Sequence, residues 1–246
     1  MAYPLRILLL ADTHLGFDLP LRPRVRRRRR GHDFQANFEA ALAPALEGRV
    51  DVVVHGGDLF HRPRVPASLA YQGLAPLVRV AEAGVPVLLV PGNHERSRIP
   101  HPRFAAHPRV LTFDRPRVFD LRVRGVPVRF VGFPFERRVR ARFPSLLRRA
   151  GWRPDPGRPS LLCMHQCVEG ATVGPSDFTF TTGDEVVRAG DLPRGLAAVL
   201  SGHIHRHQVL THDLAGLPLP APVLYPGSVE RTALAERGER KGYLVV

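Results

Sequence analysis

Five short polar clusters along this chain of 246 residues combine side chains that can bind metals. The clusters are Asp12-Thr13-His14, Gly57-Asp58-Leu59-Phe60-His61, Gly92-Asn93-His94-Glu95, His165-Gln166 and Gly202-His203-Ile204-His205. Imidazole, carboxylate and amide donors without a thiolate suit Mn, Fe or Zn better than Cu(I) or an iron–sulfur cluster. The sequence therefore predicts a metal centre with nitrogen and oxygen ligands.

The spacing within the clusters indicates which side chains can share a site. Asp12 and His14 are two residues apart, as are His203 and His205, so in an extended chain each pair points to one side. Each residue taken alone has a simpler explanation, because a buried histidine is more often structural and Asp12 could cap a helix or a turn. The occurrence of five such clusters in one chain favours the metal centre.

The third cluster separates two roles. Asn93 and His94 are adjacent and should point in different directions, so one can bind a metal while the other faces a substrate. Glycines accompany these clusters and let the backbone approach a ligand closely, at positions 56, 57, 92 and 202.

Each cluster follows a short apolar run that predicts a buried strand. The runs cover residues 5–11, 52–55, 85–90, 160–165 and 196–200. The carboxyl ends of parallel strands converge on one crevice of an α/β sheet. We therefore expect the polar clusters to face a common point.

The segments between these runs define the fold class. Residues 34–46 and 68–83 carry apolar positions at helical spacing, and alternating strands and helices imply parallel pairing. Further strands are predicted in the back half at 118–123, 126–133, 209–214, 223–225 and 242–246. No segment reads as a linker, so we predict a single α/β domain over residues 1–246 with two packed sheets.

The net charge of +14 is concentrated in two segments. Residues 22–30 hold seven arginines and residues 137–149 hold six, and neither segment holds an acidic residue. Such a concentration favours a polyanionic partner, although a charge run can also be merely solvated. The candidate nucleic-acid-binding residues are Arg22, Arg24, Arg26, Arg27, Arg28, Arg29, Arg30, Arg137, Arg138, Arg140 and Arg142.

Composition excludes several other classes. Two cysteines, Cys163 and Cys167, are too few for a disulfide scaffold or a cysteine zinc site. No apolar run approaches the roughly 20 residues of a membrane span. The apolar stretch at residues 7–11 is too short for a signal peptide, so a cytoplasmic protein without a membrane partner is expected.

The five clusters, in this order, resemble the motifs of the calcineurin-like metallophosphoesterases. The finer resemblance is to the SbcD-type nucleases of double-strand-break repair. It rests on the first two clusters and on a C-terminal set comprising Tyr225-Pro226-Gly227-Ser228, Glu230-Arg231 and Lys241-Gly242. The resemblance implies an α-β-β-α sandwich with two sheets.

The resemblance also implies two divalent metal ions, usually manganese, that activate a water for attack on a phosphodiester. The first ion would be held by Asp12, His14 and His205. The second would be held by Asn93, His165 and His203, with Asp58 bridging both. His94 would protonate the leaving oxygen or stabilise its charge, and His61 would help to orient His94.

The function implied is a manganese-dependent DNA nuclease, chiefly an exonuclease, that binds DNA without sequence preference. SbcD-type nucleases continue into a capping domain and a segment that binds the ATPase SbcC. Neither region is recognised here, so the ATPase partner is in doubt. The alternatives are a small-molecule phosphatase or phosphodiesterase and a non-catalytic nucleic-acid-binding module.

Overall fold

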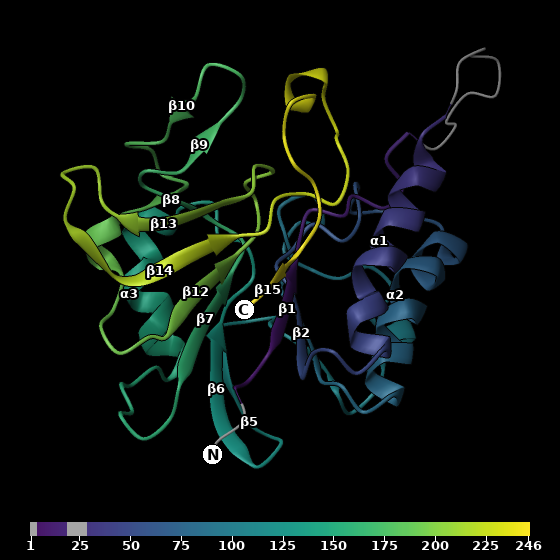
Figure 1. The fold of residues 1–246 in the computed structure, drawn as a ribbon, viewed down its shortest axis with the longest axis horizontal. Helices are drawn as coiled ribbons and strands as arrows, with labels where there is room; N and C mark the ends of the chain where they lie inside the picture. Colours follow the sequence, from purple (N-terminus) through teal and green to yellow (C-terminus); the bar gives the residue numbers. More distant parts are fainter. Residues whose placement is uncertain (1–3, 19–28) are drawn as a thin grey trace.

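Two β-sheets lie face to face with helices on both outer sides, as the computed structural model shows (Figure 1). The structure describes residues 4–18 and 29–246. The α-β-β-α arrangement expected from the sequence is confirmed. Within the described ranges, no helix has the length and apolar character needed to cross a membrane.

The first sheet carries the N-terminal half of the chain. Its strand order is β15-β1-β2-β3-β4, and all neighbours are parallel except the β1–β15 pair. Helices α1 (Gly31–Leu46) and α2 (Ala67–Glu82) connect its first strands and cover its outer face. The strands are β1 (Ile7–Leu10), β2 (Val52–His55), β3 (Val87–Leu89), β4 (Val110–Thr112) and β15 (Leu244–Val245).

The second sheet is mixed and has the order β13-β14-β12-β7-β6-β5. Helix α3 (Val139–Ala150) follows β6 and covers the outer face of this sheet. The strands are β5 (Arg117–Val123), β6 (Val126–Gly132), β7 (Ser160–Met164), β12 (Ala198–Ser201), β13 (Gln208–His212) and β14 (Pro218–Tyr225). The short elements are β8 (Cys167–Val168), β9 (Thr172–Val173), β10 (Phe178–Thr179), β11 (Val186–Val187), η1 (Pro102–Ala105), η2 (Ala189–Asp191) and η3 (Leu234–Glu236).

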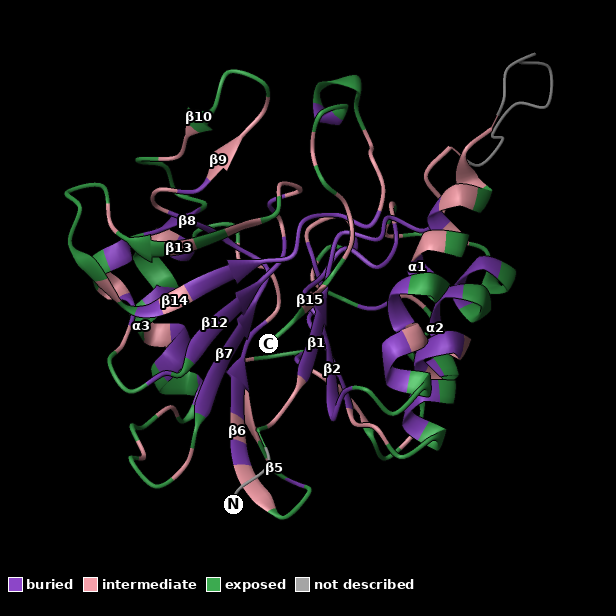
Figure 2. Ribbon diagram, viewed as in Figure 1, coloured by how far each residue is buried: buried purple, intermediate pink, exposed green. Residues whose placement is uncertain are grey.

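The alternation of side chains along the strands builds separate cores. In β1, Leu8 and Leu10 pack against α1 and α2, whereas Ile7 and Leu9 pack between the sheets. A continuous apolar run is required because both faces of this strand are buried (Figure 2). Because side chains on both faces of such a strand are buried in a core, only residues at its ends are available for a site.

The strands predicted from apolar runs agree with the structure to within a few residues. The hairpin of β5 and β6 and the antiparallel pair of β13 and β14 are both present. The short strands β4 and β8–β11 were not predicted, because two or three residues carry too little periodicity to be recognised.

Candidate metal centre

The polar clusters gather at the carboxyl ends of the strands, and the first and last of them form one group. The Nε2 atoms of His14 and His205 are 3.0 Å apart, and His205 Nε2 lies 3.7 Å from Asp12 Oδ1. Asp12 and His14 follow β1, while His205 follows β12. One ligand atom from each of the three lies within 4.8 Å of the others, so the group can hold an ion.

A second group lies beside the first. His165 Nε2 is 3.3 Å from Asp58 Oδ2 and 3.0 Å from Asn93 Oδ1. His203 Nδ1 is 3.1 Å from the same Asn93 oxygen. Asp58 Oδ2 also lies 4.0 Å from His14 Nε2, which places this carboxylate between the two groups. The structure thus brings together all seven side chains that the resemblance assigns to metal binding.

Four residues of this centre have a strained backbone conformation. Asp12, His14, Asp58 and His203 have φ angles of 52°, 45°, 53° and 82°. Residues with a side chain rarely adopt this left-handed region, and such strain tends to cluster at functional sites. The turns direct the polar side chains into the crevice immediately after each strand ends.

The pKa values show how strongly these groups depend on one another. Burial raises the pKa of Asp12 to about 6, and burial together with the nearby imidazole of His165 lowers the pKa of His203 to about 3. Burial would lower the pKa of His165, but the facing Asp58 carboxylate raises it to about 9. Burial opposes ionisation of Asp58, yet the His165 imidazole holds the pKa of Asp58 below its usual value. Such mutually perturbed groups are typical of functional sites.

The donor set fits cations. His165 Nδ1 donates to the carbonyl oxygen of Gly56 at 2.7 Å, and His205 Nδ1 donates to Glu236 Oε1 at 3.1 Å. Because these bonds hold the Nδ1 protons, loss of the other proton from either ring, as metal binding requires, leaves a lone pair on Nε2 that faces the neighbouring ligand atoms. Lone pairs that converge in this way repel one another, and a cation bound among them would relieve that repulsion. Outer hydrogen bonds to Nδ1 are how metal-binding histidines are commonly oriented.

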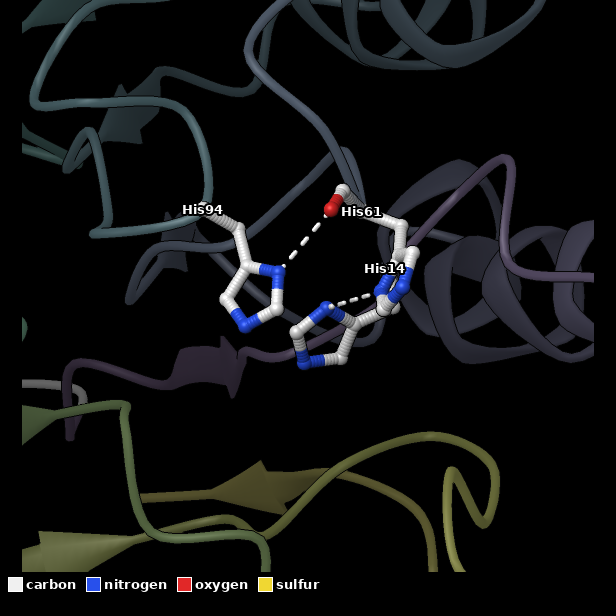
Figure 3. A group of neighbouring side chains, drawn as sticks. All are labelled: His14, His61 and His94. Atoms are coloured by element: carbon white, nitrogen blue, oxygen red, sulfur yellow. Dashed lines mark hydrogen bonds between the residues drawn. The ribbon is translucent and has the colours of Figure 1, made fainter.

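The two proposed catalytic histidines lie together beside the metal-binding groups. His94 Nδ1 donates to the carbonyl oxygen of His61 at 2.9 Å, which leaves His94 Nε2 directed elsewhere (Figure 3). His61 Nδ1 lies 3.4 Å from His14 Nδ1, and burial, His94 and Arg62 lower the pKa of His61. One nitrogen from each of His14, His61 and His94 also lies within 4.8 Å of the others, so these three could hold an ion as well. A ligand role and a proton-transfer role for His94 therefore make different predictions.

Glu95 connects two of the loops that carry the candidate ligands. Its buried carboxylate accepts hydrogen bonds from the backbone N–H of Phe60 at 2.8 Å and of Gly92 at 2.9 Å. Burial raises the pKa of Glu95 to about 8. The side chain ties together the loops that carry Asp58 and Asn93. The sequence placed Glu95 in a motif but gave no signal of this bracing role.

Replacing Gly92 with alanine should destabilise the protein and disturb the centre. An added Cβ would meet Asp58 Oδ1 at 2.1 Å and the Asp58 backbone nitrogen at 2.5 Å. We expect a loss of about 1–3 kcal/mol in the free energy of unfolding, measured by denaturant titration. Gly190→Ala is the matched control, because a Cβ at that exposed position meets nothing within 4 Å. Equal stability of the two variants would show that the loop carrying Asp58 shifts to accommodate the added methyl group at little cost in free energy.

Of the arginines predicted to bind nucleic acid, some are already neutralised. Arg22, Arg24, Arg26, Arg27 and Arg28 lie outside the described residues. The ion-paired members are Arg29 with Asp18, Arg30 with Glu230, Arg137 with Glu185, Arg140 with Glu169 and Arg142 with Glu136. Arg138 is exposed at the start of α3. The role of these arginines stays a prediction.

A third basic cluster was not predicted from the sequence. Arg62, Arg64 and Arg96 are exposed and, with Pro63, line a depression of about 380 Å³. Among the described residues, no ion pair neutralises these three arginines. Arg62 follows His61 directly, and its positive charge contributes to lowering the pKa of His61. Sequence reasoning missed it because the three arginines form no run.

Curated relatives are DNA repair proteins of archaea. The chain is 28% identical over 220 residues to "DNA double-strand break repair protein Mre11" of Saccharolobus solfataricus, covering 85% of this chain and 51% of that protein. It is 44% identical over 95 residues to the protein of the same name from Haloferax volcanii, covering 38% of this chain and 20% of that protein. The chain thus spans about half the length, or less, of the curated relatives it matches.

Solved structures share the fold. A dimetal phosphatase from Danio rerio superposes with a TM-score of 0.53 at 14% identity, covering 92% of this chain and 88% of that chain. The family model described as calcineurin-like phosphoesterase matches residues 5–207, which contain every residue of the two metal-binding groups. The chain therefore belongs to the calcineurin-like phosphoesterase family.

Proposed function

We propose that this protein is a metal-dependent DNA nuclease that hydrolyses phosphodiester bonds without sequence preference. His94 Nε2 lies 4.0 Å from Asp58 Oδ2 of the buried metal-binding groups. The observation that carries the proposal is that three unneutralised arginines, at 62, 64 and 96, follow His61 or His94 within three residues and line one depression. Such arginines can contact the phosphates that flank a scissile bond. The names of the curated relatives agree with a role in the repair of DNA breaks.

The side chains divide the chemistry among themselves. Two bound ions, for which manganese is our choice, would supply Lewis acidity and lower the pKa of a nucleophilic water. Asp12, His14 and His205 would hold one ion, Asn93, His165 and His203 the other, and Asp58 both. His94 Nδ1 donates its proton to the His61 carbonyl oxygen, so in the doubly protonated ring the second proton is on Nε2 and can pass to the leaving oxygen. His61 fixes the orientation of that ring through its backbone.

The direct test is cleavage of end-labelled single- and double-stranded DNA with Mn²⁺, compared with bis-p-nitrophenyl phosphate. Chelator-sensitive degradation of DNA is the expected result, and an end-labelled strand also reports whether digestion starts at an end. Turnover of the small diester with DNA left intact would favour a small-molecule phosphodiesterase instead. Binding of DNA without cleavage of either substrate would indicate a binding module.

The arginine cluster at 62, 64 and 96 should matter for DNA and not for a small substrate. The slope of log K for DNA binding against log salt concentration should become less negative by about 2–3 when all three are replaced with serine. The reason is that roughly one counterion is released per phosphate contact. Hydrolysis of bis-p-nitrophenyl phosphate should be unchanged. Filter binding at several salt concentrations measures the slope.

The matched control removes the same charge elsewhere. Arg153, Arg188 and Arg194 are exposed and lie outside both basic segments, and their replacement with serine should leave the slope close to that of the native protein. If both triple variants flatten the slope equally, the attraction comes from net charge rather than from the depression that Arg62, Arg64 and Arg96 line.

A further inference from the structure

The one lysine of this chain is buried next to the candidate metal centre. Thirty-six residues are lysine or arginine, and Lys241 alone is lysine. Its side chain is 6% exposed, and Nζ donates to the His205 carbonyl oxygen at 2.9 Å, Glu236 Oε2 at 2.5 Å and Glu239 Oε2 at 3.1 Å. An ammonium has three donors, and all three have acceptors here. The planar fork of an arginine does not match three acceptors around one point.

Glu236 connects this lysine to the histidine. Its second oxygen, Oε1, accepts hydrogen bonds from His205 Nδ1 at 3.1 Å and from Thr232 Oγ1 at 2.7 Å. Thr232 Oγ1 also lies 3.2 Å from His205 Nδ1. Because the Thr232 hydroxyl proton is directed at Glu236, both oxygens near Nδ1 act as acceptors. His205 therefore carries its proton on Nδ1 and directs the Nε2 lone pair toward His14 and Asp12.

The loop that supplies these residues is held in place by its own contacts. Residues 226–243 leave β14, pass through η3 and return to β15, above the upper ends of both sheets (Figure 1). Arg231 donates from Nε to the Glu236 carbonyl oxygen at 3.2 Å and from Nη2 to the Glu239 carbonyl oxygen at 2.8 Å. These bonds fix the backbone at Glu236 and at Glu239, three residues further along the chain.

We propose that Glu236 and Lys241 are positioning residues that set the tautomer and orientation of His205 for metal binding. Lys241 fixes the Glu236 carboxylate and the His205 backbone, and Glu236 fixes the imidazole. The inference rests on the metal centre of the proposed function. Both residues contact His205 and not the other proposed ligands, so they would act through the affinity of His205 for its ion.

Metal affinity in a matched pair of variants tests the proposal. Glu236→Gln should weaken binding of one of the two Mn²⁺ ions by about 10–100-fold in equilibrium dialysis, because its amide cannot satisfy both the imidazole and the ammonium. Glu239→Gln should keep native affinity, since Glu239 contacts Lys241 and Arg206 but no histidine. Lys241→Arg, which keeps the charge, should weaken the same ion by a smaller factor. Equal affinity in the Glu236→Gln and Glu239→Gln variants would overturn the proposal.

A second readout needs no metal. The ¹⁵N shifts of the imidazole in the metal-free protein distinguish a proton on Nδ1 from one on Nε2. The native protein and Glu239→Gln should show His205 protonated on Nδ1, and Glu236→Gln should lose that preference. A native His205 protonated on Nε2 would contradict the positioning role. Failure of the native protein to take up Mn²⁺ would refute the metal centre itself, and the ¹⁵N shifts would still decide whether Glu236 sets the tautomer.

Discussion

Replacing Asp58 with asparagine should lower the rate of DNA cleavage by about three orders of magnitude, the effect of losing several kcal/mol of charge stabilisation. The Asp58 carboxylate is buried and lies between the two metal-binding groups, 3.3 Å from His165 and 4.0 Å from His14. Asparagine has the same shape and retains an oxygen that can accept the hydrogen bond from the backbone N–H of His94, whose nitrogen is 2.9 Å from Asp58 Oδ1. The loss therefore reports the missing charge rather than a collapsed loop.

Metal content and turnover should fall together in this variant. Inductively coupled plasma analysis after dialysis gives the number of bound ions, and steady-state kinetics gives turnover. Asp184→Asn removes a charge from an exposed position and should change neither quantity. If the variant keeps both ions and native turnover, Asp58 is not a metal ligand. Retained DNA affinity with lost turnover is expected, because the arginines proposed to contact phosphates are untouched.

Replacing His94 with alanine should slow DNA cleavage by about 10²–10⁴-fold while both ions stay bound, the usual loss when a general acid is removed. The effect should depend on the leaving group. The leaving oxygen of DNA is a deoxyribose alkoxide that needs a proton, whereas p-nitrophenolate is stable without one. Hydrolysis of bis-p-nitrophenyl phosphate should therefore be much less affected, which a comparison of kcat for the two substrates would reveal.

The His94→Ala variant also distinguishes the two possible roles of His94, general acid and metal ligand. If His94 were a ligand in a group with His14 and His61, the alanine variant would lose an ion and slow down equally on both substrates. His212→Ala is a suitable control, because His212 is exposed at the end of β13. Its replacement should alter neither metal content nor cleavage.

The sequence was most informative where chemistry follows a buried strand. The run that becomes β1 is apolar at every position because both faces are covered, so Asp12 stands out as the first polar residue after it. The order of the five clusters then identified the family, and the α-β-β-α layers followed from it. These features were predictable because each depends on local pattern and on one general rule about strand ends.

The surroundings of the site were not predictable, because they depend on partners distant in the sequence. Arg140 reads as part of a free basic run, yet the fold places Glu169 2.9 Å from it. Glu236 has no motif of its own, and only the path of its loop brings it to His205, 31 residues away in the chain. Electrostatic pairing across loops leaves no periodic trace in a single sequence.

The pairing of β1 with β15 has a consequence for the order of folding. Ile7 exchanges two backbone hydrogen bonds with Val246, so one edge of β1 is closed by residues from the opposite end of the chain. Until β15 arrives, β1 offers an open edge beside an apolar face, and such edges template aggregation. Contacts between such distant residues also form slowly. Renaturation yield should therefore respond to changes in residues 226–243 more sharply than the stability of the finished fold does.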